Sequence, residues 1–533
     1  MGQTVNLLSL DFGGSNPSSP TQKEQPSTSA RLLFSFYPIG QDSLIPYYIY
    51  QTLILVKNEL PSPATALLPI IVLIGLMVIV VHLFGSDALN GGSQIALLTA
   101  SAVCVALTLF VSKKSWASVS TAMKETIGSA SEPIIILLII GMLSGAWMIS
   151  GTVPTLIAYG VQIMSPRFFL FTTCLICAVV SVLTGSSWTT IATLGVALMG
   201  IGTVLGLPTP MTAGAIISGA YFGDKISPLS DTTVLASSTA GTDLFTHIRY
   251  MLGTTVPSMT ICLVIFFILG FTVTPESGID VSSYISGLKG AFAISPWTLI
   301  VPLITALLIA RRTPALVTLF LSALAGGIAA LILQPHLLME IAGADATWPL
   351  LKGLFQTLFG STSIETGNAL LNDLVSTGGM AGMLNTVWLI LCALTFGSTM
   401  VAGGMLQSIT MMLIRGIKGT VGLVGSTVAT GAVMNLTCSD QYLSIILTAN
   451  MYKNVYKEKG YESRLLSRST EDAVTVTSVL IPWNSCGMTQ SAVLGVPTLI
   501  YLPYCFFNYI SPLMSVLVAA LGWNIKRQLP AKG

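Results

Sequence analysis

The chain has 533 residues, of which 53% are hydrophobic and only 8% are charged. Soluble proteins carry about a quarter charged residues, so this composition excludes a soluble globular protein and predicts a polytopic membrane protein. The formal net charge of +2 is too small to suggest a nucleic-acid partner. The eight cysteines fall mostly inside apolar runs, which argues against a disulfide framework. The three histidines have no HExxH spacing and build no metal site.

The first 62 residues are predicted to be a disordered or interfacial extension, 1–62, that precedes the membrane domain. Residues 1–30 are rich in Ser, Pro, Gln and Thr and show no apolar period. Residues 31–56 are more apolar but are interrupted by prolines, and a start placed too far upstream would also explain them. No basic region followed by an apolar run and a cleavage site is evident, so we expect no signal peptide.

The first two membrane spans are predicted at 64–84 and 93–111, because about 20 apolar residues cross a bilayer. The loop between them holds Asp87 and no basic residue, whereas Lys113 and Lys114 follow the second span. Basic residues accumulate on the cytoplasmic side of membrane proteins. We therefore expect a multi-pass protein of the inner, cytoplasmic membrane with its N-terminus in the cytoplasm.

Residues 168–206 are predicted to form a helical hairpin that enters the membrane and turns back. The run is too long for one ordinary span, and the sequence TGSSWTT (184–190) interrupts it near the middle. A polar tip at membrane depth needs an aqueous pocket. We expect the tip to face such a pocket, and the glycines of the second arm to pack against the first arm: Gly195, Gly200, Gly202 and Gly206.

The stretch from Tyr221 to Asp243 places four ionisable groups between the apolar segments 203–220 and 253–274. A charged side chain that faces lipid costs about 3 kcal/mol, so these groups must face water, protein or an ion. Pro228 lacks a backbone donor, and a continuous helix is therefore not expected here. Broken helices around a cavity are the means by which transporters hold small cations. The four groups are Asp224, Lys225, Asp231 and Asp243.

The second half of the chain repeats this plan. Residues 143–191 align with 394–445, so that TGSS (184–187) meets TCSD (437–440). The stretch that contains IPWNSCG (481–487) then corresponds to the break near Asp231. Internal symmetry of this kind, with paired interrupted segments, is typical of transporters with a site near the membrane midplane.

The two halves are predicted to be inverted relative to one another. Arg311 and Arg312 follow the span 296–310, which should therefore run towards the cytoplasm. The predicted fold is all-α, with two inverted-topology repeats that each contain a re-entrant helical hairpin and a broken helix. The expected units are a first repeat at 63–274, a linker at 275–295, a second repeat at 296–525 and a cytoplasmic tail at 526–533.

The strings GDKISPLSDTT (223–233) and IPWNSCG (481–487) resemble the NhaC-type sodium/proton antiporters, a family in which sodium-coupled malate/lactate exchangers also occur. The resemblance covers residues 64–525. It implies secondary transport of Na+ and H+, with no cofactor. The wider ion-transporter superfamily adds re-entrant hairpins, elevator motion and a homodimer to what the resemblance implies. The tips TGSS and TCSD are similar in kind to the Ser-Asn-Thr tips of that superfamily but differ from them letter by letter.

Exchange requires only one carboxylate that binds either Na+ or H+, because burial makes protonation compete with cation binding. Sodium prefers oxygen ligands. The candidate carboxylates are Asp224, Asp231 and Asp440, and the candidate neutral ligands are Ser186, Ser187, Thr189, Ser227, Ser230, Ser439, Asn484 and Ser485.

Structural roles compete with each of these assignments. Asp231 is also suited to cap a helix that starts at Thr232. Asp224 has the alternative of an ion pair with Lys225 or Arg249, and Asp440 that of accepting hydrogen bonds from the amides of its tip. The neutral candidates have the alternative of satisfying local backbone groups. Two further acids, Glu471 and Asp472, also have a functional and a structural alternative, and we expect them at a helix start, where the helix dipole favours acids.

The nearest alternative function is a sodium-coupled exchanger of organic anions of the malate/lactate type, in which hydroxyl and amide groups at the two tips would hold a carboxylate. An intramembrane protease is a different class. It would need an intramembrane Ser–His pair or a GxGD motif, but His82 and His247 are poorly placed and GxGD is absent. We therefore expect a transporter and not an enzyme.

Overall fold

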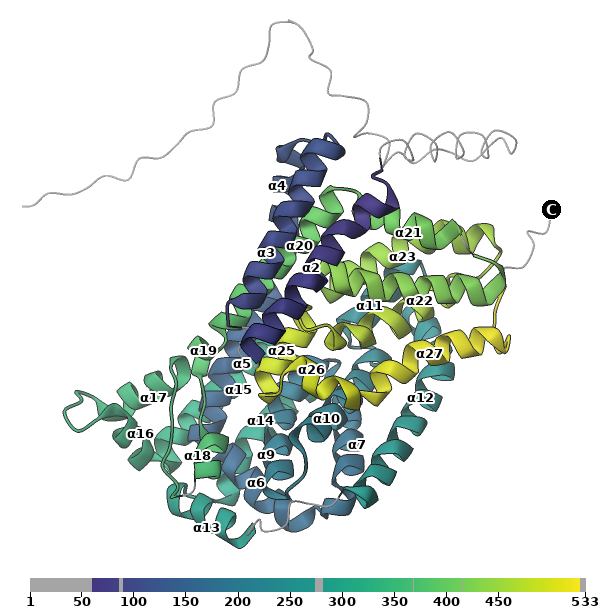
Figure 1. Ribbon diagram of the computed structural model, residues 1–533. Helices are drawn as coiled ribbons and strands as arrows, with labels where there is room; N and C mark the ends of the chain where they lie inside the picture. Colours follow the sequence, from purple (N-terminus) through teal and green to yellow (C-terminus); the bar gives the residue numbers. More distant parts are fainter. Residues whose placement is uncertain (1–59, 86–89, 274–280, 368, 416, 528–533) are drawn as a thin grey trace, which may run out of the picture. The chain divides into compact units, whose positions relative to one another are not determined.

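Helices form nearly all of the secondary structure in the residues that the computed structural model describes, which are 60–85, 90–273, 281–367, 369–415 and 417–527 (Figure 1). Outside helices, this part of the chain contains only two isolated β-bridges, Thr362 with Thr377 and Tyr461 with Arg527. The predicted extension at 1–62 and tail at 526–533 lie almost wholly outside the described residues. The predicted linker contains a helix, α13 (Val281–Ala291).

Nine helices in the described ranges are long and apolar enough to cross a membrane. They are α2 (Pro63–Phe84), α3 with the turn after it (Gly92–Val111), α5 (Ser131–Ile149), α7 (Pro166–Thr184), the segment Ser187–Val204 that contains α8 (Ser187–Thr190) and α9 (Val196–Val204), α12 (Leu244–Thr272), α15 (Ala315–Leu333), α19 with α20 (Gly379–Ala402) and α22 (Gly419–Cys438). Two bent pairs raise the number to eleven, Ser282–Ala291 with Pro296–Ala310 (84°) and Thr498–Tyr504 with Phe506–Ala520 (58°).

The remaining helices connect and flank these spans. They are α4 (Trp116–Ser129), α6 (Thr152–Ile163), α10 (Thr209–Ile226), α11 (Asp231–Ala240), α14 (Ile300–Ala310), α16 (Pro335–Ala342), α17 (Pro349–Phe359), α18 (Ala369–Val375), α21 (Met405–Arg415), α23 (Gln441–Glu458), α24 (Ser463–Thr470), α25 (Ser485–Leu494), α26 (Thr498–Tyr501) and α27 (Phe506–Ala520).

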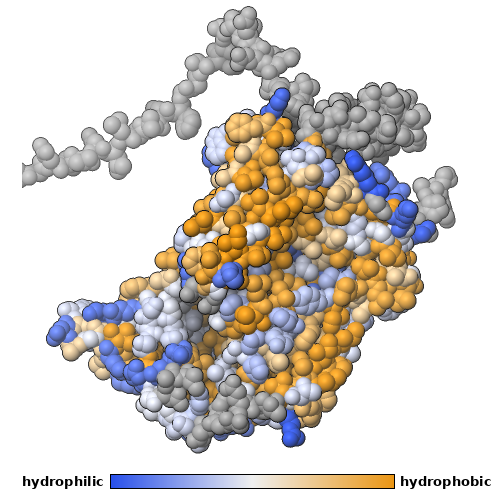
Figure 2. Space-filling view, in the orientation of Figure 1, coloured by the Kyte–Doolittle hydropathy of each residue, from blue (hydrophilic) through white to orange (hydrophobic). Residues whose placement is uncertain are grey.

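The outer surface of the spans is apolar. Ile71 and Val78 of α2 and Ile268 of α12 are each more than half exposed. Figure 2 shows hydrophobic side chains over much of the visible face. An apolar surface of this extent is unfavourable in water but suits hydrocarbon, and the predicted multi-pass membrane protein is thereby confirmed.

The helix that leads to the predicted break packs closely against its neighbours. A Cβ atom added at Gly219 of α10 would overlap the carbonyl of Cys174, and one at Gly223 would overlap that of Ala178. Small residues let helix backbones approach in this way. α10 therefore lies in close contact with α7, and its C-terminal end is fixed beside the tip that follows α7.

The arms around the first tip pack differently from the sequence-based expectation. α7 packs mainly along α10 and α12, whereas α9 packs against α6 and α10. Gly195 faces α10 and Gly200 faces α6, while Gly202 contacts both α10 and α7. The expectation that all these glycines pack against the first arm is wrong, because α10 lies between the arms. The re-entrant character of the hairpin stays a prediction.

Residues with positive φ and helix-capping residues recur in the two halves at an interval of 254 residues. We call them the backbone landmarks. The interval is one residue longer than the sequence alignment gives at the tips, so that Ser186 corresponds to Asp440 and not to Ser439. The inverted orientation of the halves stays a prediction. The paired landmarks are Gly185 (φ 68°) with Ser439 (φ 58°), Gly206 with Gly460 (both φ 72°), the helix caps Ser230 with Asn484, and Gly241 (φ 78°) with Gly495 (φ 67°).

Candidate functional site

The predicted helix break is present between α10 and α11, at residues 227–230. Ser230 caps α11, its hydroxyl oxygen accepting the N–H of Thr233 at 3.4 Å. Asp231 is the first residue of α11, and its Oδ1 accepts the N–H of Thr232 at 2.8 Å. The alternative in which Asp231 caps a helix from Thr232 is therefore wrong by one residue, since Ser230 occupies the cap.

Asp224 lies buried at the end of α10, where the break meets the first tip. Its Oδ2 accepts a hydrogen bond of 2.7 Å from the hydroxyl of Ser187, and its Oδ1 accepts one of 2.7 Å from Ser230. The alternative ion pair is wrong, because Lys225 pairs with Asp472 and no salt bridge reaches Asp224 within the described ranges. A carboxylate that accepts one hydroxyl hydrogen bond at each oxygen retains lone pairs for a cation.

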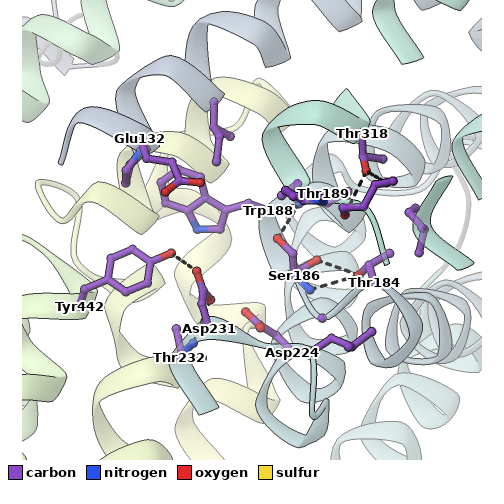
Figure 3. A pocket seen from close by; sticks show the side chains of 18 of the residues that line it. Glu132, Thr184, Ser186, Trp188, Thr189, Asp224, Asp231, Thr232, Thr318 and Tyr442 are labelled. Carbon is purple, nitrogen blue, oxygen red and sulfur yellow. Dashed lines mark hydrogen bonds between the residues drawn. The ribbon is translucent and has the colours of Figure 1, made fainter. Parts of the chain in front are cut away.

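A cavity of about 420 Å³ opens beside Asp224. Its walls carry three carboxyl groups, those of Glu132, Asp224 and Asp231, and one basic side chain, that of Arg312. Figure 3 shows these acids around one space, with Trp188 next to Glu132 and Ser186 next to Asp224. An excess of negative groups in a concave site attracts cations. The other lining residues include Thr184, Thr189, Thr232, Thr318, Gln441 and Tyr442.

Asp231, Ser186 and Thr189 line this cavity as well. The Asp231 side chain is exposed to the cavity and its Oδ2 accepts a hydrogen bond of 2.7 Å from the hydroxyl of Tyr442. Ser186 caps α8 by accepting the N–H of Thr189 at 3.2 Å. Ser227 is engaged elsewhere, because its hydroxyl donates to the carbonyl of Val182 at 2.8 Å. Ser227 therefore ties the break to α7.

The second tip is built around Asp440, which caps α23 by accepting the N–H of Leu443 at 2.9 Å. The Ser485 hydroxyl donates to Asp440 Oδ2 at 3.3 Å, and the Ser485 N–H donates to the carbonyl of Ser439 at 2.8 Å. Asn484 caps α25 by accepting the N–H of Cys486 at 3.0 Å. These contacts match the structural alternative for Asp440, which is buried and does not line the cavity.

The two tips meet at the same cavity even though Asp440 lies behind its wall. Gln441 and Tyr442, which follow Asp440 directly, line the cavity together with Asp224 and Asp231. The structure thus brings Asp224, Asp231 and the first-tip hydroxyls together. Asp440, Ser439, Asn484 and Ser485 form a second cluster beside them.

A buried group of charged side chains was not assigned to the site from sequence. Lys225 forms an ion pair with Asp472 and donates to the hydroxyl of Ser511 at 2.7 Å, and both charged groups are fully buried. Arg468 lies 3.9 Å from Asp472 and stacks over the ring of Tyr250. The string RSTED (468–472), with three charges in a charge-poor chain, was the signal for it.

Glu471 and Asp472 lie where α24 passes into a π-helical turn, Glu471–Thr475, and not at the start of a helix. The expectation of a helix start is wrong because the helix already begins at Ser463. The fourth ionisable group of the first stretch, Asp243, caps α12 by accepting the N–H of Thr246 at 2.9 Å, which holds the pKa of that carboxyl below its usual value. Asp243 thus has a structural role.

The donor set suits a hard cation better than a transition metal. Within the described part of the chain, no three His, Cys, Asp or Glu side chains gather at metal-binding spacing. One carboxylate and two hydroxyls are instead grouped at Asp224. Hard cations take oxygen ligands of these kinds.

Known proteins share this sequence over most of its length. A sequence profile of the Na+/H+ antiporter family matches residues 50–243 and 219–523. The chain is similar to the Na(+)/H(+) antiporter NhaC of Alkalihalophilus pseudofirmus, at 37% identity over 78% of this chain and 87% of that relative. It is similar to NhaC of Bacillus subtilis at 36% identity (76% and 87%), and to the malate-2H(+)/Na(+)-lactate antiporter of that organism at 35% (76% and 85%). The resemblance found from sequence is confirmed, and the chain belongs to the Na+/H+ antiporter family.

Proposed function

We propose that this chain is a secondary active transporter that exchanges Na+ for H+ across the cytoplasmic membrane by alternating access. The observation that carries the proposal is the carboxyl group of Asp224, which lines the cavity and accepts hydrogen bonds from Ser187 and Ser230. In an ionised state it supplies the negative charge, and the two hydroxyl oxygens supply neutral ligands. Family membership supports the same activity.

Asp231 and Glu132 fit a role in drawing cations into the cavity. Both carboxyl groups line it, and Asp231 is exposed, so that it keeps its hydration and interacts with an arriving ion mainly through charge. Asp224, by contrast, is almost fully buried, with 4% of its surface exposed. A desolvated carboxylate binds a cation more strongly than a hydrated one. We therefore assign binding to Asp224 and attraction to the other two.

Alternating access fits the repeated architecture. The shared landmarks at 254 residues support two structural repeats, and we propose that they are inverted, with a re-entrant hairpin and a broken helix in each. The N-terminus is then cytoplasmic, as the basic residues after the second span indicate. The homodimer and the elevator motion that the superfamily resemblance implies remain predictions.

The organic-anion alternative is not favoured by the charges of the cavity. Three carboxyl groups line it against the single guanidinium of Arg312, and they would repel a dicarboxylate. The relative that exchanges malate for lactate is also slightly less similar than the two NhaC relatives. The charges of the cavity therefore favour exchange of Na+ for H+ without an organic anion.

The test is proton flux in liposomes that contain the purified full-length protein. NaCl is added outside, and the internal pH is followed with a dye, with and without malate or lactate. We expect Na+ to trigger proton movement without any organic acid. Flux that appears only when an organic acid is present would contradict the proposal and favour the alternative.

A further inference from the structure

A chain of two hydroxyl groups joins the carboxyl group of Asp224 to a second buried carboxyl group. The Ser230 hydroxyl lies 2.7 Å from Asp224 Oδ1 and 2.9 Å from the hydroxyl of Thr232. The Thr232 hydroxyl lies 3.2 Å from Oε1 of Glu471, which is distant in sequence and belongs to the π-helical turn. Three hydrogen-bonding contacts therefore run in series from Asp224 to Glu471.

The number of protons in this series decides the protonation of its ends. Three hydrogen bonds need three protons, and the hydroxyls of Ser230 and Thr232 supply two. With both carboxyl groups ionised, Ser230 would donate to Asp224 and Thr232 to Glu471. The 2.9 Å contact between the two hydroxyls would then hold no proton. All three contacts are satisfied only when one carboxyl group carries a proton.

The surroundings place that proton on Glu471. Asp224 accepts hydrogen bonds at both of its oxygens, from Ser187 and Ser230, which suits an ionised carboxylate. Glu471 has one hydrogen bond of good geometry, at Oε1, and its Oε2 is buried without such a partner, although the Thr475 side chain lies close to this carboxyl group. With the proton on Glu471, the series runs in one direction: Glu471 donates to Thr232, Thr232 to Ser230, and Ser230 to Asp224.

The charges that face Glu471 are balanced in this state. Asp224 and Lys225 face it from α10, Asp472 follows it, and Arg468 lies on α24. His247 of α12 is hydrogen-bonded to the hydroxyl of Ser467. Two acids and two bases cancel while Glu471 is neutral. Loss of its proton leaves one negative charge in a buried group, and a bound cation would restore neutrality.

We infer that Glu471 holds a proton that leaves when a cation binds at Asp224, an inference that rests on the proposed exchange of Na+ for H+. Glu471 does not line the cavity, but Thr232 does. The O–H bond of Glu471 breaks as its proton bonds to Thr232, and the proton that Thr232 held passes to cavity water as hydronium. Glu471 is left as a carboxylate, and Na+ binds to the now negative cluster.

The test compares two activities of the full-length protein in liposomes at several pH values. Exchange of labelled for unlabelled Na+ needs no net proton movement, whereas Na+-driven proton flux does. In the wild type, the KM for Na+ in the first activity should rise on acidification, by at most about tenfold for each pH unit, and level off at a high value once Glu471 stays protonated and Na+ is held by Asp224 alone. Glu471→Gln fixes the neutral form, so its KM should stay at the high acid value at every pH, with kcat retained and proton flux lost.

Companion variants separate proton handling from packing. Thr232→Val keeps the shape of the side chain but removes the hydroxyl that passes the proton. Proton flux should therefore fall while Na+ exchange continues. Thr232→Ser should restore the proton flux. Glu471→Asp should recover part of the pH dependence. Thr448→Val, a buried hydroxyl on α23 outside the series, is the matched control and should behave as the wild type.

Two results would overturn the inference. A Glu471→Gln protein whose KM still follows pH as in the wild type would place the proton elsewhere. A Glu471→Gln protein that loses both activities would make Glu471 a structural residue. Wild-type protein without Na+-driven proton flux would instead refute the proposed function itself.

Discussion

The hydroxyl of Tyr442 on α23 donates a hydrogen bond of 2.7 Å to Asp231 on α11, across 211 residues of sequence. The contact joins the two halves of the chain at the wall of the cavity and holds one oxygen of an exposed carboxylate in place. The other oxygen accepts the N–H of Thr232, so that both carboxylate oxygens of Asp231 are hydrogen-bonded.

Tyr442→Phe should raise the KM for Na+ by a few-fold, because a hydrogen bond of this kind contributes about 1 kcal/mol. Removal of the hydroxyl frees the Asp231 carboxylate without changing the size of the side chain. Na+ titration of proton flux in liposomes measures the effect. An unchanged KM would show that the orientation of Asp231 has no part in cation entry.

Asp224→Asn should abolish Na+-driven proton flux in a folded protein. Asparagine keeps the shape and one acceptor oxygen, but it removes the negative charge that binds the cation. Thermal unfolding in detergent checks the fold, and a flux assay at saturating Na+ checks the activity. Asp231→Asn is the comparison within the same cavity, where we expect weaker Na+ binding with flux retained at high Na+. Full flux in Asp224→Asn would remove Asp224 from the mechanism.

Asp440→Asn should leave transport nearly unchanged, whereas Asp440→Ala should lower the free energy of unfolding by about 1 kcal/mol. The reason is that Asp440 caps α23, and asparagine is an equally good cap. Unfolding followed by circular dichroism and the flux assay together provide the measurement. Loss of flux in a stable Asp440→Asn protein would assign Asp440 to cation binding instead.

Lys225→Met should lower the free energy of unfolding by about 3 kcal/mol, since it leaves the buried carboxylate of Asp472 with only its longer contact of 3.9 Å to Arg468. The double variant Lys225→Met with Asp472→Leu removes both charges of the pair but leaves Arg468 without its acid, and we expect it to recover part of that loss. Thermal unfolding of the purified protein measures both variants. A double variant no more stable than the single one would contradict the role of the pair as mutual charge compensation.

Local signals allowed much of the fold to be predicted from sequence. The lengths of the apolar runs located the spans, because a bilayer sets the length of a helix that crosses it. Pro228 and the cluster of hydroxyl residues after it located the break between α10 and α11. Asp224, Ser187 and Ser230 were candidates because polar groups in apolar sequence need partners.

The remaining features depend on contacts that no local pattern reports. Lys225 and Asp472 are 247 residues apart, and their pairing follows from the packing of α10 against the second half. Glu471 reaches the site only through Thr232. The one-residue error in the repeat arose because Ser439 takes a left-handed conformation that glycine takes at the first tip.

Asp224 and Lys225 are consecutive residues in the last turn of α10, and one faces the cavity while the other pairs with Asp472. A rotation or bend of α10 that changes the direction of the Asp224 side chain would also break the ion pair of Lys225 with Asp472. Both charges would then lie unpaired in an apolar interior. The end of α10 is therefore held as a rigid wall, anchored to the second half of the chain. We therefore expect the end of α10 to keep its conformation while the cavity opens and closes, and Glu132 and Arg312 line that cavity from other elements, at the start of α5 and after α14.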